Sequence, residues 1–180
     1  MLMKLLETAK QELIRSNADH RHPFKLLTLA TVDHTNTPQL RTVVKRNIDI
    51  DFQVLIYTDS RTPKVDQISA NEMVSALWYH PKKKLQVRME CVATIVDQSA
   101  DLHIEHLKRI SLSKSIKDYT TLAAPGSVLS DNVEFGEEVN FSLIVLKPYQ
   151  IEVLQLNRDQ HSRAMYTREN NDWTETKLVP

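Results

Sequence analysis

Most of this 180-residue chain consists of short segments in which apolar and polar residues alternate, and most of these segments end in turn-forming residues. Alternation of this kind is typical of β-strands with one buried face. We expect strands at residues 25–32, 39–48, 52–58, 73–79, 85–96, 141–146, 150–156, 163–168 and 173–178. Turn chemistry at residues 35–38 and 169–172 predicts that the first two and the last two strands form hairpins.

Three other segments have helical spacing. The first lies within residues 1–20 and predicts an amphipathic helix. Its apolar residues are Leu2, Leu5, Leu6, Ala9 and Leu13. Pro63 stands at the first turn of a short helix expected over residues 62–71. A third helical stretch is expected over residues 100–119, and residues 120–140, whose periodicity is weak, are expected to form a loop.

The order of these segments determines the expected fold class. Strands follow strands directly, and no strand–helix–strand alternation is present. A parallel sheet is therefore disfavoured. We expect a mainly β fold, a six- to eight-stranded antiparallel split β-barrel with an N-terminal helix and peripheral helices, in a single domain over residues 1–180.

Composition excludes several classes of function. Lys and Arg together number 23 and so do Asp and Glu, so no field of the whole chain attracts nucleic acid or an anionic membrane. The chain has two glycines, Gly126 and Gly136, too few for a dinucleotide fingerprint or a glycine-rich phosphate loop. A bound phosphate would therefore be held mainly by side chains.

The expected location is the cytoplasm. The first residues lack the apolar run of a signal peptide, and no later segment reads as membrane-spanning. Cys91 is the single cysteine, which fits a reducing compartment. It lies in an alternating strand, where a small packed residue is a better interpretation than a nucleophile.

Cations interrupt one of the predicted strands. Arg41 and Arg46 bracket Val43 and Val44. Residues five apart in a regular strand point to opposite faces unless a bulge intervenes, so at most one of the two arginines enters the barrel. On the strand alone, two solvated rim arginines are an equally good interpretation.

The end of the third strand leads directly into a helix. This junction contains Thr58, Arg61 and Lys64, spaced three residues apart. Backbone N–H groups, a hydroxyl and two cations are therefore expected near the positive end of the helix dipole. This pattern indicates a phosphate site that needs no glycine. An ordinary N-cap by Ser60 or Thr62, with exposed cations, is the alternative.

Two further groups of polar residues have more than one interpretation. Gln86 and Arg88 share one face of the fifth strand, where the glutamine amide can meet either the edge of a planar heterocycle or a neighbouring strand. His103 and His106 flank Glu105 on the third helical stretch. A third metal ligand is not evident, so we expect no metal and a solvated helix face.

In order and spacing, these segments resemble the pyridoxamine 5'-phosphate oxidase family, whose members are FMN-binding split β-barrels. That family has a strand R-x-V-x-L-K, then F-Y-T, a serine-arginine-lysine helix start, a strand R-Q-V, and a tail E-F-W-Q…R-L-H-D-R…W…R-L-x-P. The counterparts here are residues 41–46 (RTVVKR), 56–58 (IYT), 61–64 (RTPK), 85–87 (LQV), 151–155 (IEVLQ), 161–163 (HSR), Trp173 and 177–180 (KLVP). The similarity covers roughly residues 26–96 and 141–180.

The resemblance implies FMN at a homodimer interface, with a small-molecule substrate. It implies that Arg41 and Lys64, helped by Arg61 and Thr62, hold the FMN phosphate. The other residues that it implies for cofactor binding are Thr42, Val43, Val44, Arg46, Tyr57, Thr58, Gln86 and Arg163, with Gln86 reaching the flavin edge across the interface. Arg46, which replaces a family lysine near flavin and substrate, and His161 are the candidate catalytic residues.

Two departures from the family pattern affect the expected substrate. Leu154 stands where the family has a tryptophan beside the flavin, and Asp159 stands where it has a substrate-binding arginine. We therefore expect an FMN-binding oxidoreductase whose substrate differs from pyridoxamine 5'-phosphate or is unknown. The alternatives are a flavin-binding module without turnover, for storage or sensing, and a barrel that has lost its cofactor and acts through its dimer surface.

Overall fold

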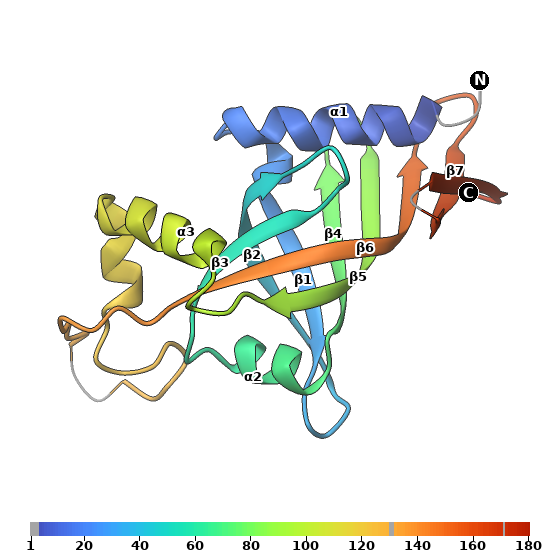
Figure 1. Cartoon of the computed structure of the whole chain (residues 1–180). Coiled ribbons are helices and arrows are strands. Elements are labelled where there is room, and N and C mark those ends of the chain that lie inside the picture. The colour runs from blue at the N-terminus through green and yellow to red at the C-terminus, as the bar shows by residue number, and fades with distance from the viewer. Residues whose placement is uncertain (1–3, 130–131, 171) are drawn as a thin grey trace.

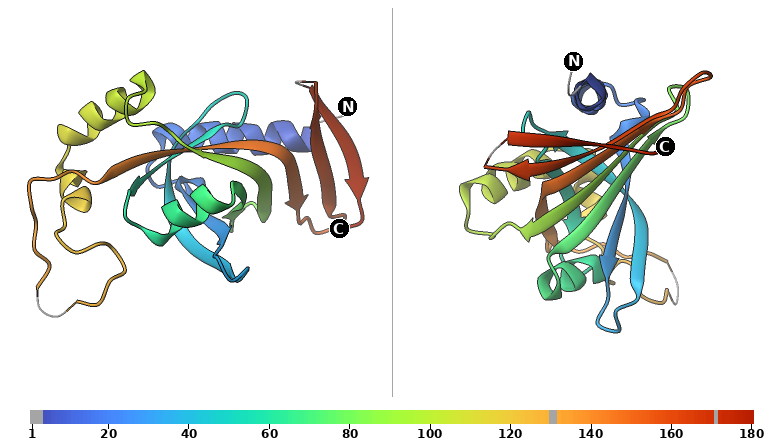
Figure 2. Two further views of the ribbon diagram at one scale, coloured as in Figure 1. Left: turned by 60° about the horizontal axis from the view of Figure 1, so that its bottom comes forward. Right: turned by 90° about the vertical axis from the view of Figure 1, so that its right-hand side faces the viewer.

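The computed structural model describes residues 4–129, 132–170 and 172–180 (Figure 1). In the described residues one antiparallel sheet has the strand order β3-β2-β1-β4-β5-β6-β7-β8, and β3 also pairs with β6. Six strands thus close a barrel, while β7 and β8 extend beyond it (Figure 2). The strands are β1 (Leu26–Val32), β2 (Pro38–Ile48), β3 (Val54–Asp59), β4 (Met73–His80), β5 (Leu85–Ile95), β6 (Phe141–Gln155), β7 (Ser162–Glu169) and β8 (Asp172–Leu178). The predicted fold class is confirmed.

Helices lie at both ends of the barrel and on one side of it. The helices are α1 (Lys4–Ala18), η1 (Pro23–Lys25), α2 (Pro63–Ala70), α3 (Asp101–Ser111) and η2 (Lys114–Tyr119). α1 runs across one end, α2 lies at the opposite end, and α3 stands beside β3 (Figure 1). No helix of the described residues is long and apolar enough to cross a membrane. The division into a single domain stays a prediction.

The single helical stretch predicted over residues 100–119 is wrong. The structure has α3 and η2 instead, separated at Ser113, whose backbone is extended. The Ser113 amide and hydroxyl both donate to the carbonyl of Ile110. Serine competes in this way with the helical hydrogen-bond pattern, which favours a break at such a position.

The two separate strands predicted over residues 141–146 and 150–156 are also a wrong prediction, because β6 runs through Pro148 without a break. β3 pairs with β6 only up to Leu146, and β7 begins to pair with it at Gln150. Residues 147–149 therefore have a neighbouring strand on the β5 side alone. A proline is tolerated there because its missing N–H would have faced no ladder partner.

Buried apolar side chains form two clusters on the two faces of β3 and β6. The first fills the barrel, extends to α1 and β7, and includes Trp78, Tyr166 and the fully buried Cys91. The second lies outside the barrel, where Ile110 and Tyr119 pack against Phe141 and Leu143 of β6 and against β3. Every residue from 141 to 146 is consequently buried. This double burial explains why the sequence of this part of β6 lacks a clear alternation.

Candidate functional site

The two arginines of β2 lie on opposite faces of that strand. Arg41 pairs with the fully buried Leu29, on the face that lines the barrel. Arg46 lies at a register shift between Lys45 and Asn47, and its Cζ is 4.8 Å from the ring centroid of Tyr57, on the outer face. Strand alternation predicts this separation, while the bulge is a feature that the residue pattern left open.

Arg41 reaches the end of the barrel that α2 covers. Its guanidinium donates to Thr31 Oγ1 at 2.6 Å and to Gln67 Oε1 of α2 at 2.9 Å. Both acceptors are neutral. Their hydrogen bonds fix the guanidinium without neutralising its charge, and burial lowers the pKa of Arg41 from its ordinary value.

Lys64, in the first turn of α2, belongs to the same end of the barrel. Its Nζ donates to Thr58 Oγ1 at 2.9 Å, and the hydroxyls of Thr58 and Thr62 are 3.1 Å apart. Thr62 is the N-cap residue, yet its hydroxyl donates to the carbonyl of Asp59, and no side chain caps the helix. The first turn of α2 therefore keeps uncapped N–H groups beside a lysine and two hydroxyls.

The charge of Arg41 acts on Lys64. Burial lowers the pKa of Lys64, and the nearby Arg41 lowers it further. Among the described residues no ion pair includes either of them. Asp59, a carboxylate that raises the pKa of Lys64 and so partly opposes these effects, is paired with Arg61 at 2.7 Å. Two partly buried cations without a carboxylate partner are complementary to a small anion such as a phosphate.

Arg61 lies beside this cluster but is occupied elsewhere. Its Nε and Nη2 donate to the carboxylate of Asp59 at 3.1 and 2.7 Å. The same guanidinium donates to the carbonyls of Thr121 and Leu122 at 2.8 and 3.1 Å. Arg61 thus fastens the start of the segment 120–140 to the end of β3, so its contacts in this structure are structural.

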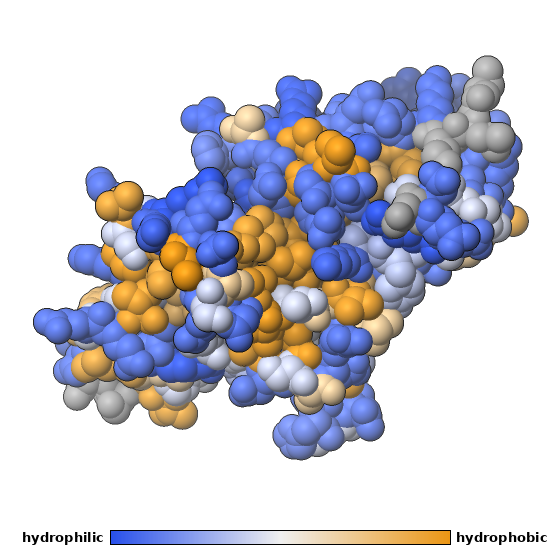
Figure 3. All heavy atoms as spheres, in the orientation of Figure 1, coloured by the Kyte–Doolittle hydropathy of each residue, from blue (hydrophilic) through white to orange (hydrophobic). Residues whose placement is uncertain are grey.

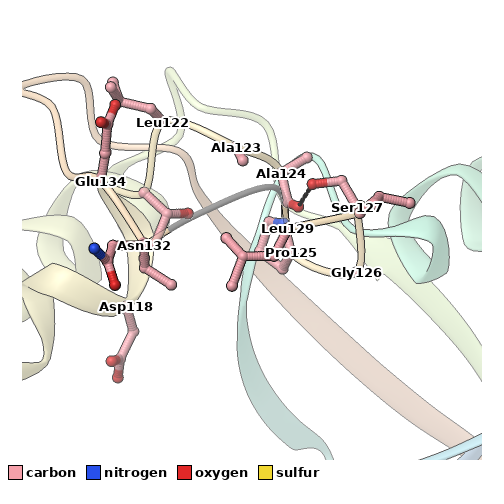
Figure 4. A pocket seen from close by; sticks show the side chains of 13 residues that line it. Asp118, Leu122, Ala123, Ala124, Pro125, Gly126, Ser127, Leu129, Asn132 and Glu134 are labelled. Atoms are coloured by element: carbon pink, nitrogen blue, oxygen red, sulfur yellow. Dashed lines mark hydrogen bonds between the residues drawn. The ribbon is translucent and has the colours of Figure 1, made fainter.

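Two surface hollows lie apart from the cationic cluster. One is lined by Asp118 and by residues 121–129 and 132–134, with Leu122, Pro125 and Leu129 among them (Figure 4). The other, of about 600 Å³, has an apolar floor that includes Leu55 and Val145. Hydrophobic side chains also gather near the middle of the face that Figure 3 shows. None of the predicted site residues lines either hollow.

Comparison with known proteins identifies the family of this chain. The FMN-binding domain model of pyridoxamine 5'-phosphate oxidase matches residues 5–97 of this chain. The chain belongs to that family. The resemblance drawn from its sequence motifs is thereby confirmed.

Individual relatives agree with the family assignment. The pyridoxine/pyridoxamine 5'-phosphate oxidase of Bartonella henselae is 28% identical, over 86% of this chain and 82% of that protein. A pyridoxamine 5'-phosphate oxidase-related, FMN-binding protein from Nostoc punctiforme has a TM-score of 0.76 at 24% identity, with 100% and 98% of the two chains covered. PhzG from Burkholderia lata, solved with tetrahydrophenazine-1-carboxylic acid, has a TM-score of 0.76 at 21% identity, with 97% and 92% covered. The two structures show a common fold.

Residues expected to contact the flavin lie in two separate places. Gln86 pairs with Leu154, which pairs with Arg163, so the three side chains lie side by side on the outer face of β5, β6 and β7. Gln86 is near the α1 end of the barrel, because the turn before β5 binds α1 through Lys83. Arg41 is at the α2 end (Figure 1). A single chain therefore does not bring Arg41 close to the group of Gln86, Leu154 and Arg163.

Arg163 is held rigidly by a buried carboxylate. Its Nε and Nη2 both approach Glu152 Oε1, at 3.0 and 2.8 Å. The other oxygen of Glu152 accepts from Arg88 Nη2 at 2.9 Å. His161 is exposed, and its Nδ1 accepts from the Asn157 amide at 3.2 Å. Glu152 was not singled out in the sequence, although a carboxylate within a buried strand is a signal for a charged partner.

The remaining predicted cofactor residues divide between the two faces of β2 and β3. Val43 faces the barrel and packs against its core. Thr42 is exposed, and Val44 lies with it on the outer face. Tyr57 also faces outward, against the second apolar cluster. A ligand along the outer face would meet Thr42, Val44 and Tyr57, but not Val43.

The prediction that His103 and His106 occupy a solvated helix face is wrong. Their exposed fractions are 3% and 7%. The Tyr57 hydroxyl is hydrogen-bonded to His106 Nδ1, and His103 Nε2 lies 3.4 Å from the carbonyl of Phe141. The sequence did contain a signal for the burial of His106, because this residue lies with Ile110 on the apolar face of α3.

A second group of titratable side chains was missed altogether. Glu12, His22 and His80 place their ligand atoms within 4.8 Å of one another. The Nδ1 atoms of both histidines accept backbone N–H groups, from Phe24 at 3.0 Å and from Lys83 at 3.3 Å. Their Nε2 atoms must then carry the hydrogens and cannot ligate a cation. The arrangement fits a buried hydrogen-bonded carboxylate and not a metal site.

Proposed function

We propose that this chain is an FMN-binding oxidoreductase that works as a homodimer. The observation that carries the proposal is the Arg41–Lys64 pair, two neighbouring, partly buried cations without an ion-pair partner among the described residues. Family membership supports FMN as the anion, because the matching family model is an FMN-binding domain. The chain has too few glycines for a backbone phosphate loop, so a side-chain site is what its composition permits.

In this proposal the protein positions the cofactor and tunes its surroundings. FMN, when bound, supplies the hydride or electron chemistry. Arg41 and Lys64 neutralise its phosphate, and Thr58 and Thr62 offer hydroxyls beside them. Tyr57 and Arg46 border the outer face of β3 and are assigned to the flavin and substrate side.

The homodimer is part of the same proposal. Gln86 and Arg163 lie at the opposite end of the barrel from Arg41 and Lys64, so a second copy is the simplest source of a flavin contact from that group. Arg163 reaches such an interface already oriented, because Glu152 fixes its guanidinium. Both arguments agree with the dimer implied by the sequence resemblance.

The substrate is proposed to differ from pyridoxamine 5'-phosphate. Asp159, His161 and Arg163 border a hollow of about 970 Å³ beside the β7–β8 hairpin. Asp159 occupies the position of the family's substrate-binding arginine, and a carboxylate repels an anionic substrate group there. Leu154 cannot stack on a ring as a tryptophan does.

Absorption spectroscopy and FMN titration test the proposal. The purified protein is expected to be yellow or to take up added FMN. Arg41→Ala and Lys64→Ala are each expected to raise the Kd for FMN about 10- to 100-fold, since each removes a charge-assisted hydrogen bond worth about 1.5–3 kcal/mol. Arg109→Ala, which removes an exposed cation paired with Glu105, is the control and should leave the Kd unchanged. A protein that takes up no FMN, or equal affinity in all variants, contradicts the proposal.

A flavin-binding module without turnover is the second candidate. Leu154 and Asp159 favour it, because both replace residues that the family uses near flavin and substrate. Anaerobic mixing of the FMN-loaded protein with physiological amines and with NAD(P)H separates the two functions. Bleaching of the flavin band by a donor supports the oxidoreductase. A flavin that only dithionite reduces supports the module.

A further inference from the structure

Three side chains from three elements meet between the barrel and α3. Tyr57 of β3 is hydrogen-bonded through its hydroxyl to Nδ1 of His106, and the two rings are 5.4 Å apart. Arg46, at the bulge of β2, lies over the aromatic ring of Tyr57, with its Cζ 4.8 Å from the ring centroid. Phe141 packs against the tyrosine edge at 5.1 Å. The phenol is therefore held from three sides.

The protons of this group can be assigned from its surroundings. Burial raises the pKa of Tyr57 and lowers the pKa of His106, and Arg109 acts in the same direction on the histidine. Both side chains are consequently neutral near pH 7. The phenol then donates to Nδ1, which leaves the hydrogen of the imidazole on Nε2.

This hydrogen bond affects the arginine as well as the tyrosine. A phenol that donates to a good acceptor gains electron density, which strengthens the attraction between its ring and a guanidinium. Nε of Arg46 is buried and has no hydrogen-bond partner among the described residues. Nε therefore adds no contact that holds the side chain, and the guanidinium is placed by the ring of Tyr57 together with a hydrogen bond to Tyr119.

We propose that His106 is a positioning residue that fixes the guanidinium of Arg46 through the hydroxyl of Tyr57. The inference rests on the proposed function, in which Tyr57 and Arg46 border the flavin and the substrate. α3 would then contribute to the site without touching either ligand. A buried N–H donor without an acceptor is costly, and an acceptor brought by a ligand would remove that cost.

Hydrogen exchange at Arg46 Nε tests the positioning directly. The Nε–H signal in a ¹H–¹⁵N spectrum is assigned by its loss in Arg46→Lys. In His106→Phe we expect this hydrogen to exchange at least about tenfold faster than in the wild type. Tyr57→Phe should give the same increase, and the double variant should add nothing further, because both changes interrupt one connection. The visible spectrum of the FMN-loaded protein should change in parallel.

Two further variants make the result decisive. His103→Phe changes a buried histidine of the same helix that contacts Phe141 instead of Tyr57, and it should leave the exchange slow. His106→Gln keeps an acceptor for the hydroxyl and should keep the exchange slow. If His106→Phe fails to fold, Tyr57→Phe supplies the interrupted connection with which His106→Gln is compared. Unchanged exchange in His106→Phe, or equal acceleration in His103→Phe, overturns the inference. The measurement needs no cofactor, so a protein that binds no FMN would refute the proposed function without deciding this coupling.

Discussion

Lys45 is a lysine inside an apolar barrel, and its side chain is fully buried. Its Nζ donates to Asn17 Oδ1 at 2.5 Å, and no acid pairs with it among the described residues. Burial, with a smaller effect from Lys25, lowers the pKa of Lys45 to about 8. The fold therefore disfavours the charged form of this side chain.

Replacing this lysine should stabilise the protein. The folded-state pKa lies below the ordinary value of 10.5, so the unfolded chain binds more protons between about pH 8 and 10.5, and stability rises with pH through that window. Below pH 8 the cost of the buried charge is complete, on the order of 3 kcal/mol. Lys45→Met should raise the free energy of unfolding at pH 7 by up to that amount and remove the rise above pH 8. Asn17 keeps the Ile48 amide as a donor.

Denaturant unfolding at pH 7 and pH 10 measures this effect. Lys82→Met, a change at an exposed lysine of the β4–β5 turn, serves as the control and should alter neither value. A Lys45→Met protein that is less stable than the wild type at pH 7 would contradict the prediction. It would indicate that the ammonium group has a partner which offsets its burial.

Residue alternation predicted much of the site but not its electrostatics. It placed Arg41 and Arg46 on opposite faces because that question depends on the strand alone. The interior position of Lys45 depends on Asn17, which lies on another element, and on a bulge that begins next to it. The resemblance predicts that Arg61 helps to hold a phosphate. In the structure its N–H groups donate to the buried Asp59 and to the backbone carbonyls of Thr121 and Leu122. Such long-range contacts are absent from local patterns.

Among the elements, α1 is attached to the barrel by one buried carboxylate. Glu12 accepts from His22 Nε2 at 3.1 Å and from Lys83, and His80 lies 3.7 Å away. These partners belong to the segment before η1, to the β4–β5 turn and to β4. The carboxylate therefore connects the N-terminal helix to three other parts of the fold.

Acidification should weaken this attachment. Burial alone raises the pKa of Glu12, but hydrogen bonds from Lys83 and His22 outweigh it and leave that pKa below 4.5. Its stabilisation is complete above about pH 4.5 and is lost as pH falls through the lower folded-state pKa. Burial also lowers the pKa of His80, so stability already declines below about pH 6.5. Both effects have the same sign.

The variant Glu12→Gln should lower the free energy of unfolding at pH 7 by about 2 kcal/mol, since it leaves Lys83 and two histidine N–H groups without a charged acceptor. It should also flatten the decline below about pH 4.5, whereas the decline below pH 6.5, which comes from the burial of His80, should remain. Hydrogen exchange of the α1 amides and urea unfolding report the change. Glu7→Gln alters an exposed acid of the same helix and is expected to have little effect. Equal behaviour of the two variants would rule out the attachment.

One side chain of the α2 end, Arg61, contributes to holding the start of the segment that follows η2. Arg61 donates to the carbonyls of Thr121 and Leu122, and the carboxylate of Asp59 holds its guanidinium in place. Arg61→Met should therefore expose the bonds near Thr121 to proteolysis. It should leave the Kd for FMN within about threefold of the wild type, in contrast to Arg41→Ala, because its donors are already used. Limited proteolysis with an FMN titration checks both parts. A large loss of FMN affinity would restore Arg61 to the phosphate site.

On the scale of the whole molecule, one face of the sheet lacks a cover. α1 and α2 lie at the ends of the barrel and α3 lies beside β3, so in the described part of the chain no helix covers the outer face of β1, of β4 and of residues 38–44 of β2 (Figures 1 and 2). Large apolar side chains are exposed on this face. They are Leu26 at 50%, Leu40 at 69%, Met73 at 44%, Leu77 at 36% and Tyr79 at 51%. Several exposed large apolar side chains on one face of a sheet are typical of a protein interface.

The register of the strands relates this face to the proposed flavin contacts. Tyr79 pairs with Gln86 and Leu77 pairs with Arg88, so the apolar residues of β4 lie directly beside the polar residues of β5. A second copy seated on the face would also cover Gln86. The dimer and the cofactor are therefore expected to depend on each other, because each subunit would complete the other's site.

Leu77→Glu tests this dependence. A carboxylate in the centre of the apolar face should prevent association, since its desolvation costs several kcal/mol and the neighbouring Arg88 is already paired with Glu90 and Glu152. The wild type is expected at twice the chain mass of 20.8 kDa by light scattering and the variant at 20.8 kDa, with FMN affinity at least about tenfold lower. Leu112→Glu changes a leucine that is 92% exposed at the end of α3 and should remain dimeric and bind FMN. A wild-type monomer with bound FMN would show that one chain suffices, and a dimeric Leu77→Glu protein would place the interface elsewhere.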